Sequence, residues 1–218
     1  MPPVVLSAAY TAFVEACNQP GCPLCRIEHA GVLKYVTSLF HEQLNDFNLR
    51  DRLRDSLGFC REHAYFVVDE LSGNALGIAL LYQDLIKFSM HHLNDPQGSF
   101  SPKRRCPACE QRDLNMMRTL SELAKHIDDE AMSSALRKSD GLCLFHIRHA
   151  LTHTRIPEKR ALLLSIETEI LGKLRADLAE FMRKSDYRFA NETFGPERDS
   201  WRRAVAVVAG ARKTRGEK

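Results

Sequence analysis

Long apolar runs are absent from this 218-residue sequence, and so is a strong excess of charge of either sign. No run approaches the roughly 20 apolar residues of a membrane-spanning helix. A formal net charge of +3 is too small to indicate nucleic acid binding by itself. The first residues lack the basic segment and the apolar core of a secretion signal. We therefore expect a cytoplasmic protein that binds neither membranes nor nucleic acids.

Familiar catalytic motifs are also missing. The sequence contains no phosphate-binding glycine loop, no nucleophile elbow and no recognisable pair of catalytic carboxylates. Runs of β-branched residues are few, whereas aliphatic residues and alanine dominate. Because 44% of the residues are hydrophobic and 27% are charged, the composition is that of a globular domain. We expect an all-α fold, and nothing in these patterns indicates an enzyme.

Cysteine is the exception, because six of the seven cysteines belong to a motif that occurs twice. Each copy combines Cys-Pro-x-Cys with a later Gly-x-Cys-x-x-His. The cysteines and histidines of the motif are Cys22, Cys25, Cys60 and His63 in the first copy, and Cys106, Cys109, Cys143 and His146 in the second. Corresponding positions lie 83 or 84 residues apart (22 and 106, 25 and 109, 60 and 143, 63 and 146). The chain therefore contains an internal repeat with two Cys3His sets.

Three thiolates and one imidazole form the ligand set of a closed tetrahedral zinc site. In a reducing cytosol, Cys-x-x-Cys pairs indicate metal ligands rather than disulfides. We predict two Zn²⁺ ions per chain, and four protein ligands leave no open position for catalysis at the metal. Iron–sulfur clusters are an alternative, since thiolates hold those as well. Thiol–disulfide chemistry at Cys22 and Cys25, or buried inert cysteines, are further alternatives.

Each ligand set is expected to close within its own repeat, because the loop between its two halves is then shortest. Cys60 would join Cys22 and Cys25, and Cys143 would join Cys106 and Cys109. The long helices that follow the two Cys-x-x-His units are expected to pack together and share one apolar core.

Hydrophobic periodicity and helix-capping residues predict a chain of helices in both repeats. The expected helices cover residues 7–17, 23–41, 49–57, 75–93, 107–126, 129–138, 142–153, 157–184 and 197–209, and a further helix begins at residue 60 and includes residues 65–68. We expect residues 1–93 to hold the first metal-binding repeat and 94–105 to link it to the second repeat at 106–210. Residues 211–218 form a basic tail. In the long helix 157–184, a stripe of apolar residues is expected to face the core: Leu164, Leu171 and Leu178, with Ile170, Leu174 and Phe181 beside them.

The complete set of motifs resembles a bacterial family of unknown function. Its members combine Cys-Pro-x-Cys and Gly-[Phe/Leu]-Cys-x-x-His, each twice, with Asp-Tyr-Arg, a Gly…Asp-Ser-Trp stretch and a final Ala-Gly. The resemblance runs from about Cys22 to Gly210. It singles out a candidate functional patch that consists of Asp186, Tyr187, Arg188, Gly195, Asp199 and Trp201. The alternative for this patch is a C-terminal strap that docks on the bundle, with Trp201 buried and an Arg188–Asp199 ion pair.

Two functions follow from these observations. The first is a zinc-stapled helical scaffold, adaptor or regulator that binds another protein. The second is a redox-responsive or metal-responsive protein that uses labile thiolates or an iron–sulfur centre at the same residues.

Overall fold

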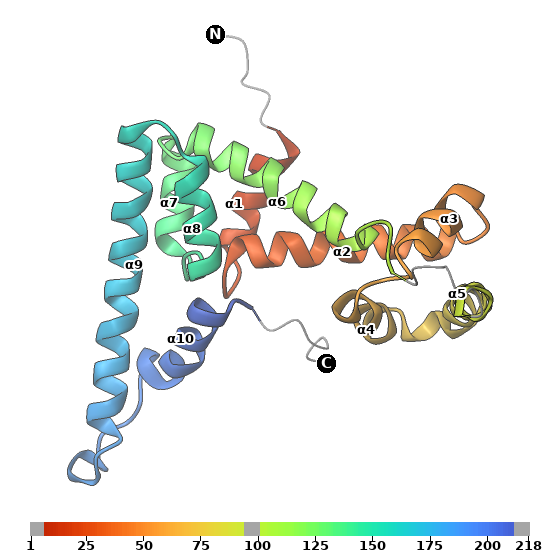
Figure 1. Cartoon of the computed structure of the whole chain (residues 1–218). Helices are drawn as coiled ribbons and strands as arrows, with labels where there is room; N and C mark the ends of the chain where they lie inside the picture. Colours follow the sequence, from red (N-terminus) through yellow and green to blue (C-terminus); the bar gives the residue numbers. More distant parts are fainter. Residues whose placement is uncertain (1–6, 94–100, 212–218) are drawn as a thin grey trace. The chain divides into compact units, whose positions relative to one another are not determined.

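The computed structural model describes residues 7–93 and 101–211, and within these ranges it contains helices and no strands (Figure 1). The all-α prediction is therefore confirmed. The α-helices are α1 (Ala8–Cys17), α2 (Pro23–Glu42), α3 (Phe47–Asp55), α4 (Arg61–Glu70), α5 (Ala75–Leu93), α6 (Pro107–His126), α7 (Glu130–Lys138), α8 (Leu144–His153), α9 (Pro157–Lys184) and α10 (Ser200–Ala209). Short 3-10 helices are η1 (Ser72–Asn74), η2 (Tyr187–Phe189) and η3 (Pro196–Asp199).

Local sequence signals fix where several helices begin and end. The side chains of Ser7, Asp46 and Asp129 cap α1, α3 and α7 by accepting backbone N–H groups of the first turn. Gly58 and Gly141 have φ values of 87° and 76°, a region that residues with a Cβ rarely adopt. They follow α3 and α7, so the chain turns sharply just before each Cys-x-x-His segment.

The described chain divides into two compact units that do not coincide with the sequence repeats. Unit 1 contains residues 7–27 and 116–211, and unit 2 contains 28–93 and 101–115. The long helices α2 and α6 each contribute to both units, because the division falls within them. The expected linker at 94–105 belongs to unit 2 where it is described, at 101–105, and residues 94–100 lie outside the described residues. The expected basic tail also lies outside them, except for residue 211.

Unit 1 has its own hydrophobic core. In it α1 packs on α7, α7 and α8 pack on α9, and α10 contacts both α8 and α9. The fully buried side chains at the centre include Phe13, Leu120, Leu142 and Leu163. On α9 the buried positions are Leu163, Ile166, Ile170 and Leu174, whereas Leu164 is 50% exposed. The predicted core role of Leu164 was therefore wrong, whereas that of Ile170 and Leu174 is confirmed.

Unit 2 has a separate core formed by α2, α3, α4, α5 and the beginning of α6. Its centre contains Val36, Leu53, Val67 and Leu81, and α3 packs on α5. Because α5 contributes to this cluster and α9 to the other, the predicted single core shared by these two helices is contradicted. Within the described ranges no single helix is long and apolar enough to cross a membrane. The pair Arg61–Glu70 and Ser72–Leu93 meets the length and composition criteria only together, with a bend of 91°.

Candidate metal centres

Four donor residues of unit 1 converge in what we call site 1: Cys22, Cys25, Cys143 and His146. The Nδ1 atom of His146 lies 3.3 Å from the sulfur of Cys22, 3.5 Å from that of Cys25 and 3.2 Å from that of Cys143. The sulfurs of Cys25 and Cys143 are 3.8 Å apart. All four donor atoms lie within 4.8 Å of one another.

Unit 2 contains the matching site 2, which consists of Cys60, His63, Cys106 and Cys109. The Nδ1 atom of His63 lies 3.3 Å from the sulfurs of Cys60 and Cys109 and 3.7 Å from that of Cys106. The sulfurs of Cys60 and Cys109 are 3.6 Å apart. The two sites therefore have the same donor set and nearly the same dimensions.

The predicted pairing within each repeat was wrong. Each site takes its Cys-x-x-Cys from one repeat and its Cys-x-x-His from the other. The physical reason lies in the long helices: α2 begins at site 1 and ends in unit 2, while α6 begins at site 2 and ends in unit 1. Each helix thus carries its own Cys-x-x-Cys away from the Cys-x-x-His of the same repeat. The prediction from loop length did not take into account that α2 and α6 are stiff helices of 20 residues each.

These distances fit a single metal ion at the centre of each site. Tetrahedral ligands at about 2.3 Å for Zn–S and about 2.0 Å for Zn–N would put sulfur atoms about 3.8 Å apart and nitrogen and sulfur about 3.5 Å apart. The S···S distances of 3.6 and 3.8 Å and the N···S distances of 3.2–3.7 Å agree with that geometry. Each group could therefore hold one metal ion.

Helix starts position the donors of both sites. Cys60 and Cys143 are the N-cap residues of α4 and α8. His63 and His146 follow three positions later, in the first turn of the same helix. The free N–H groups and the dipole at a helix N-terminus favour thiolate over thiol. The sites are thus placed where negatively charged sulfur is stabilised.

Burial and crowding of the thiols oppose their ionisation when no cation is present. Burial is the main cause that raises the pKa of Cys22 and of Cys106, and it raises the pKa of Cys109 to about 12, with a further contribution from the nearby Cys106. In site 1 the pKa of Cys143 is lowered by hydrogen bonds with Cys22 and Cys25. A bound cation would offset the cost of ionising the buried thiols, because a metal ion deprotonates the thiols that coordinate it.

Site 1 has a neighbour that the sequence patterns did not indicate, the carboxylate of Glu167 on α9. Glu167 is buried, and its two oxygens accept the backbone N–H of Leu142, next to Cys143, at 3.2 and 3.3 Å. Burial raises the pKa of this carboxyl to about 8. The sequence did contain a signal for this residue, because Glu167 occupies a core position of α9 between Leu163 and Ile170. In the first repeat Leu85 lies against Gly58, whereas in the second repeat Glu167 lies against Gly141.

Glu167→Gln is expected to remove a pH-dependent cost to stability. The carboxyl has a pKa of about 8 in the folded protein and an ordinary value of 4.5, so the unfolded chain releases its proton first and the free energy of unfolding falls as the pH rises between these values. Glutamine cannot ionise and can still accept the Leu142 N–H. In urea unfolding of the metal-loaded protein, the advantage of the variant over wild type should be on the order of 2 kcal/mol larger at pH 8 than at pH 6. An advantage independent of pH would contradict this role.

The C-terminal end of α10 covers site 1. Gly210 has a φ of 83°, and a Cβ built there would lie 3.8 Å from the sulfur of Cys25 and 3.9 Å from that of Cys143. The final glycine of the Ala-Gly motif therefore allows the backbone to turn beside two of the metal-binding sulfurs.

The charged residues of the predicted C-terminal patch form two separate ion pairs in the structure. Asp186, Tyr187 and Arg188 lie together at η2, where Arg188 pairs with Asp186 at 2.6 Å. Asp199 pairs instead with Arg203 at 2.9 Å, so the predicted Arg188–Asp199 ion pair was wrong.

Trp201 is 47% exposed, so its predicted burial was also wrong. The residues that α10 buries are Ser200 and Val207. The guanidinium of Arg202 lies 4.9 Å from the centre of the Trp201 ring. Val205 and Val208, which follow Trp201 at helical spacing, are exposed as well.

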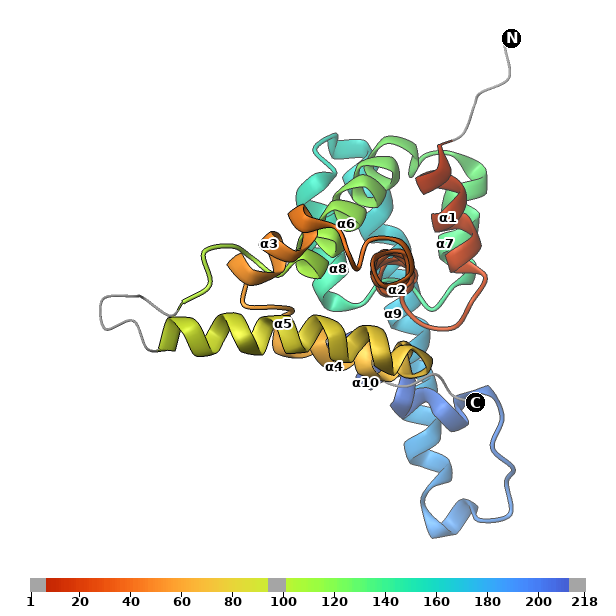
Figure 2. The same ribbon diagram turned by 90° about the vertical axis from the view of Figure 1, so that its right-hand side faces the viewer.

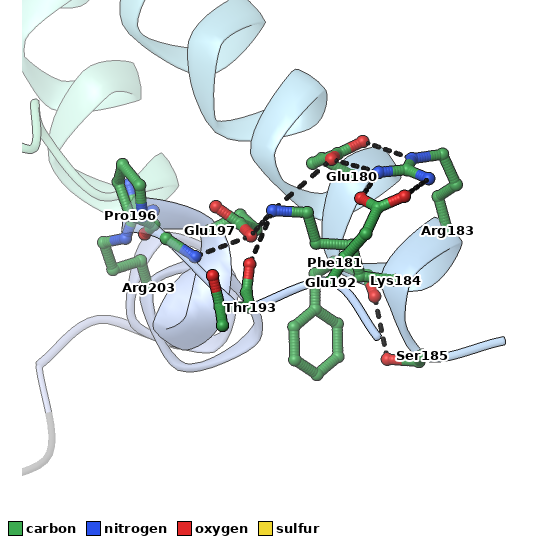
Figure 3. A network of polar contacts seen from close by, with 11 residues as sticks. Glu180, Phe181, Arg183, Lys184, Ser185, Glu192, Thr193, Pro196, Glu197 and Arg203 are labelled. Atoms are coloured by element: carbon green, nitrogen blue, oxygen red, sulfur yellow. Dashed lines mark hydrogen bonds and ion pairs between the residues drawn. The ribbon is translucent and has the colours of Figure 1, made fainter. Parts of the chain in front are cut away.

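A polar network, not a tryptophan plug, holds the C-terminal segment to the end of α9 (Figure 3). Lys184 donates to the carboxylate of Glu197 at 2.7 Å, and Arg183 pairs with both Glu180 and Glu192. Glu197 also accepts the N–H of Gly195 at 2.8 Å, and its pKa is lowered to about 2, chiefly by Lys184. A side chain on Gly195 would meet this carboxylate at 2.9 Å, which explains the glycine of the motif.

The fold and the two sites define a class: an all-helical protein, repeated in sequence, with two Cys3His groups that could each hold a metal ion. Comparison with known proteins places the chain within a family. Residues 10–105 and 99–215 both match the family of unknown function DUF6062, to which this chain therefore belongs. The twofold match reflects the sequence repeat. The resemblance to a family of unknown function noted in the sequence is thereby confirmed.

A relative is the uncharacterized 23.9 kDa protein in the xynA 3′ region of Caldicellulosiruptor sp. (strain Rt8B.4). It is 26% identical over 204 residues, which cover 90% of this chain and 98% of the relative. No solved structure matches the chain.

Proposed function

We propose that this protein is a cytoplasmic helical scaffold that two structural Zn²⁺ ions hold together, and that it acts by binding another protein. The observation that supports the metal assignment best is the spacing of the donor atoms, which suits one tetrahedral ion in each site. A cytoplasmic location agrees with six thiols that are kept reduced and available to metal.

Zinc explains the donor sets better than an iron–sulfur cluster does. A cluster binds its protein ligands through several different iron atoms, which spreads the ligands apart, whereas each set here lies within 4.8 Å. The one histidine in each set is also a common zinc ligand. The redox-responsive alternative would require iron and sulfide, or thiols that lose their metal readily.

A structural role suits these sites better than catalysis. Four protein donors fill a tetrahedral shell, so no position remains for water or substrate. Each ion would join a Cys-x-x-Cys from one repeat to a Cys-x-x-His from the other. Metal binding would then hold together segments that are far apart in the sequence, which is the work of a structural zinc site.

Elemental analysis of protein purified without added metal tests this proposal. We expect about two zinc ions per chain and a colourless protein. Iron with acid-labile sulfide and visible absorbance would support the iron–sulfur alternative instead, and a metal content near zero under anaerobic purification would refute metal binding altogether. A Cys22→Ser variant provides the matched control, because it should lower the content to about one zinc ion.

A further inference from the structure

The two metal sites differ in how far solvent reaches one equivalent pair of cysteines. In site 2 this pair is Cys60 and Cys109, whose sulfurs are 3.6 Å apart. The matching pair of site 1 is Cys143 and Cys25, whose sulfurs are 3.8 Å apart. Both cysteines of the site 2 pair are partly exposed. In site 1 only Cys25 is partly exposed, whereas Cys143 is 1% exposed.

The last helix of the chain explains the lower exposure at site 1. Helix α10 packs on α8 and α9 within unit 1, and it lies next to α9 in Figure 2. The chain leaves α10 at Gly210, where a Cβ would lie 3.8 Å from the sulfur of Cys25 and 3.9 Å from that of Cys143. The backbone at Gly210 therefore covers the sulfur pair of site 1. Among the described helices of the first repeat α5 is the last, and none corresponds to α10.

A bound zinc ion would make the exposed pair of site 2 reactive toward peroxides. Coordinated cysteines are thiolates, and the thiolate is the form that peroxides oxidise. Susceptibility to oxidation also follows exposure, so the covered pair of site 1 is protected. The sulfurs of Cys60 and Cys109 are close enough for one to attack the other once the first is oxidised.

The reaction balances with hydrogen peroxide as the only oxidant. One thiolate attacks the peroxide, whose O–O bond breaks, and the products are a sulfenic acid and a hydroxide ion. The second thiolate attacks the sulfenic sulfur, an S–S bond forms, and a second hydroxide ion leaves. Two thiolates thus lose two electrons in total, and the peroxide gains them. The zinc ion loses two of its four ligands, and a site with two donors left holds zinc only weakly.

We propose that Cys60 and Cys109 are a peroxide-oxidised pair, and that their disulfide releases the zinc ion of site 2 while site 1 keeps its ion. The proposal rests on the zinc occupancy put forward under the proposed function. It adds a chemical modification, and it assigns that modification to one of two otherwise similar sites. Because Cys106 belongs to the core of unit 2, loss of this ion would loosen unit 2 and leave the fold of unit 1 intact.

Zinc release from the full-length, metal-loaded protein tests the proposal. Zinc is first counted without peroxide, so a protein that holds no zinc refutes the proposed function before this experiment begins. One equivalent of hydrogen peroxide is then added in the presence of a chromogenic zinc indicator. We expect release of about one zinc ion per chain, and peptide mapping should find a disulfide between Cys60 and Cys109. A thiol reductant together with added zinc should restore the original content.

Two double variants assign the released ion to its site. C25S/C143S keeps only site 2 intact and should lose its ion as fast as wild type loses the first one. C60S/C109S keeps only site 1 intact and should release its ion at least about tenfold more slowly, since covered thiolates react slowly. Equal release rates in the two variants, joint loss of both ions from wild type, or a disulfide between Cys25 and Cys143 would overturn the proposal. A loaded protein that keeps both ions in peroxide would overturn it as well and leave the structural role of zinc standing.

Discussion

Complete removal of metal is expected to unfold both units of the protein. Structural zinc supplies about 10–16 kcal/mol of apparent free energy per site in small zinc domains, whereas a whole domain is stable by only about 5–15 kcal/mol. In this chain the donors are also part of the cores: Cys22 and Cys143 belong to the core of unit 1, and Cys106 belongs to that of unit 2. Without an ion, burial would disfavour the ionised forms of Cys22 and Cys106.

Circular dichroism during treatment with a strong chelator measures this effect. We expect most of the helical signal to disappear as two zinc ions per chain are released, and to return when zinc is added back under reducing conditions. Chelator that is already saturated with zinc is the control and should change nothing. A chain that keeps its helical signal and its cooperative thermal transition after losing both ions would show that the metals are not structural.

The sequence was most informative where a signal is local. The helices begin close to where capping residues and prolines predict them, because a cap acts within one turn. Ser7 and Asp129 are such caps, and Gly58 and Gly141 mark the two sharp turns. The eight donor residues were recognisable for the same reason, since each pair lies within four residues.

The partners of each donor pair could not be read from spacing. Two equal sets with equal loops permit both pairings, and the choice depends on the direction in which α2 and α6 leave their sites. Side-chain burial in the C-terminal segment escaped prediction for a related reason. Trp201 lies on an apolar face of α10, but periodicity alone does not say which face of a short helix meets the protein. Glu167 is the opposite case, because the sequence did contain a signal for it. The residue lies in the apolar stripe of α9, and an argument from composition does not detect such a position.

The exchange of donors between repeats has a sharp consequence for pairs of mutations. Cys25→Ser with Cys143→Ser removes two ligands from one site, site 1, although the residues belong to different repeats. Cys25→Ser with Cys60→Ser removes one ligand from each site, although both residues belong to the first repeat. A site that loses one ligand keeps three donors, and a site that loses two ligands keeps two. We expect either incomplete site to hold zinc much more weakly, since structural sites in proteins are almost always four-coordinate.

Zinc content of these two double variants, measured side by side after dialysis against a weak chelator, tests the exchanged arrangement most directly. We expect C25S/C143S to retain about one zinc ion per chain, bound at site 2. Limited proteolysis and circular dichroism should show that unit 2 is still folded. C25S/C60S should retain none and lose most of its helical structure. The opposite result, one ion in C25S/C60S and none in C25S/C143S, would mean that each repeat closes its own site and would contradict the arrangement described above.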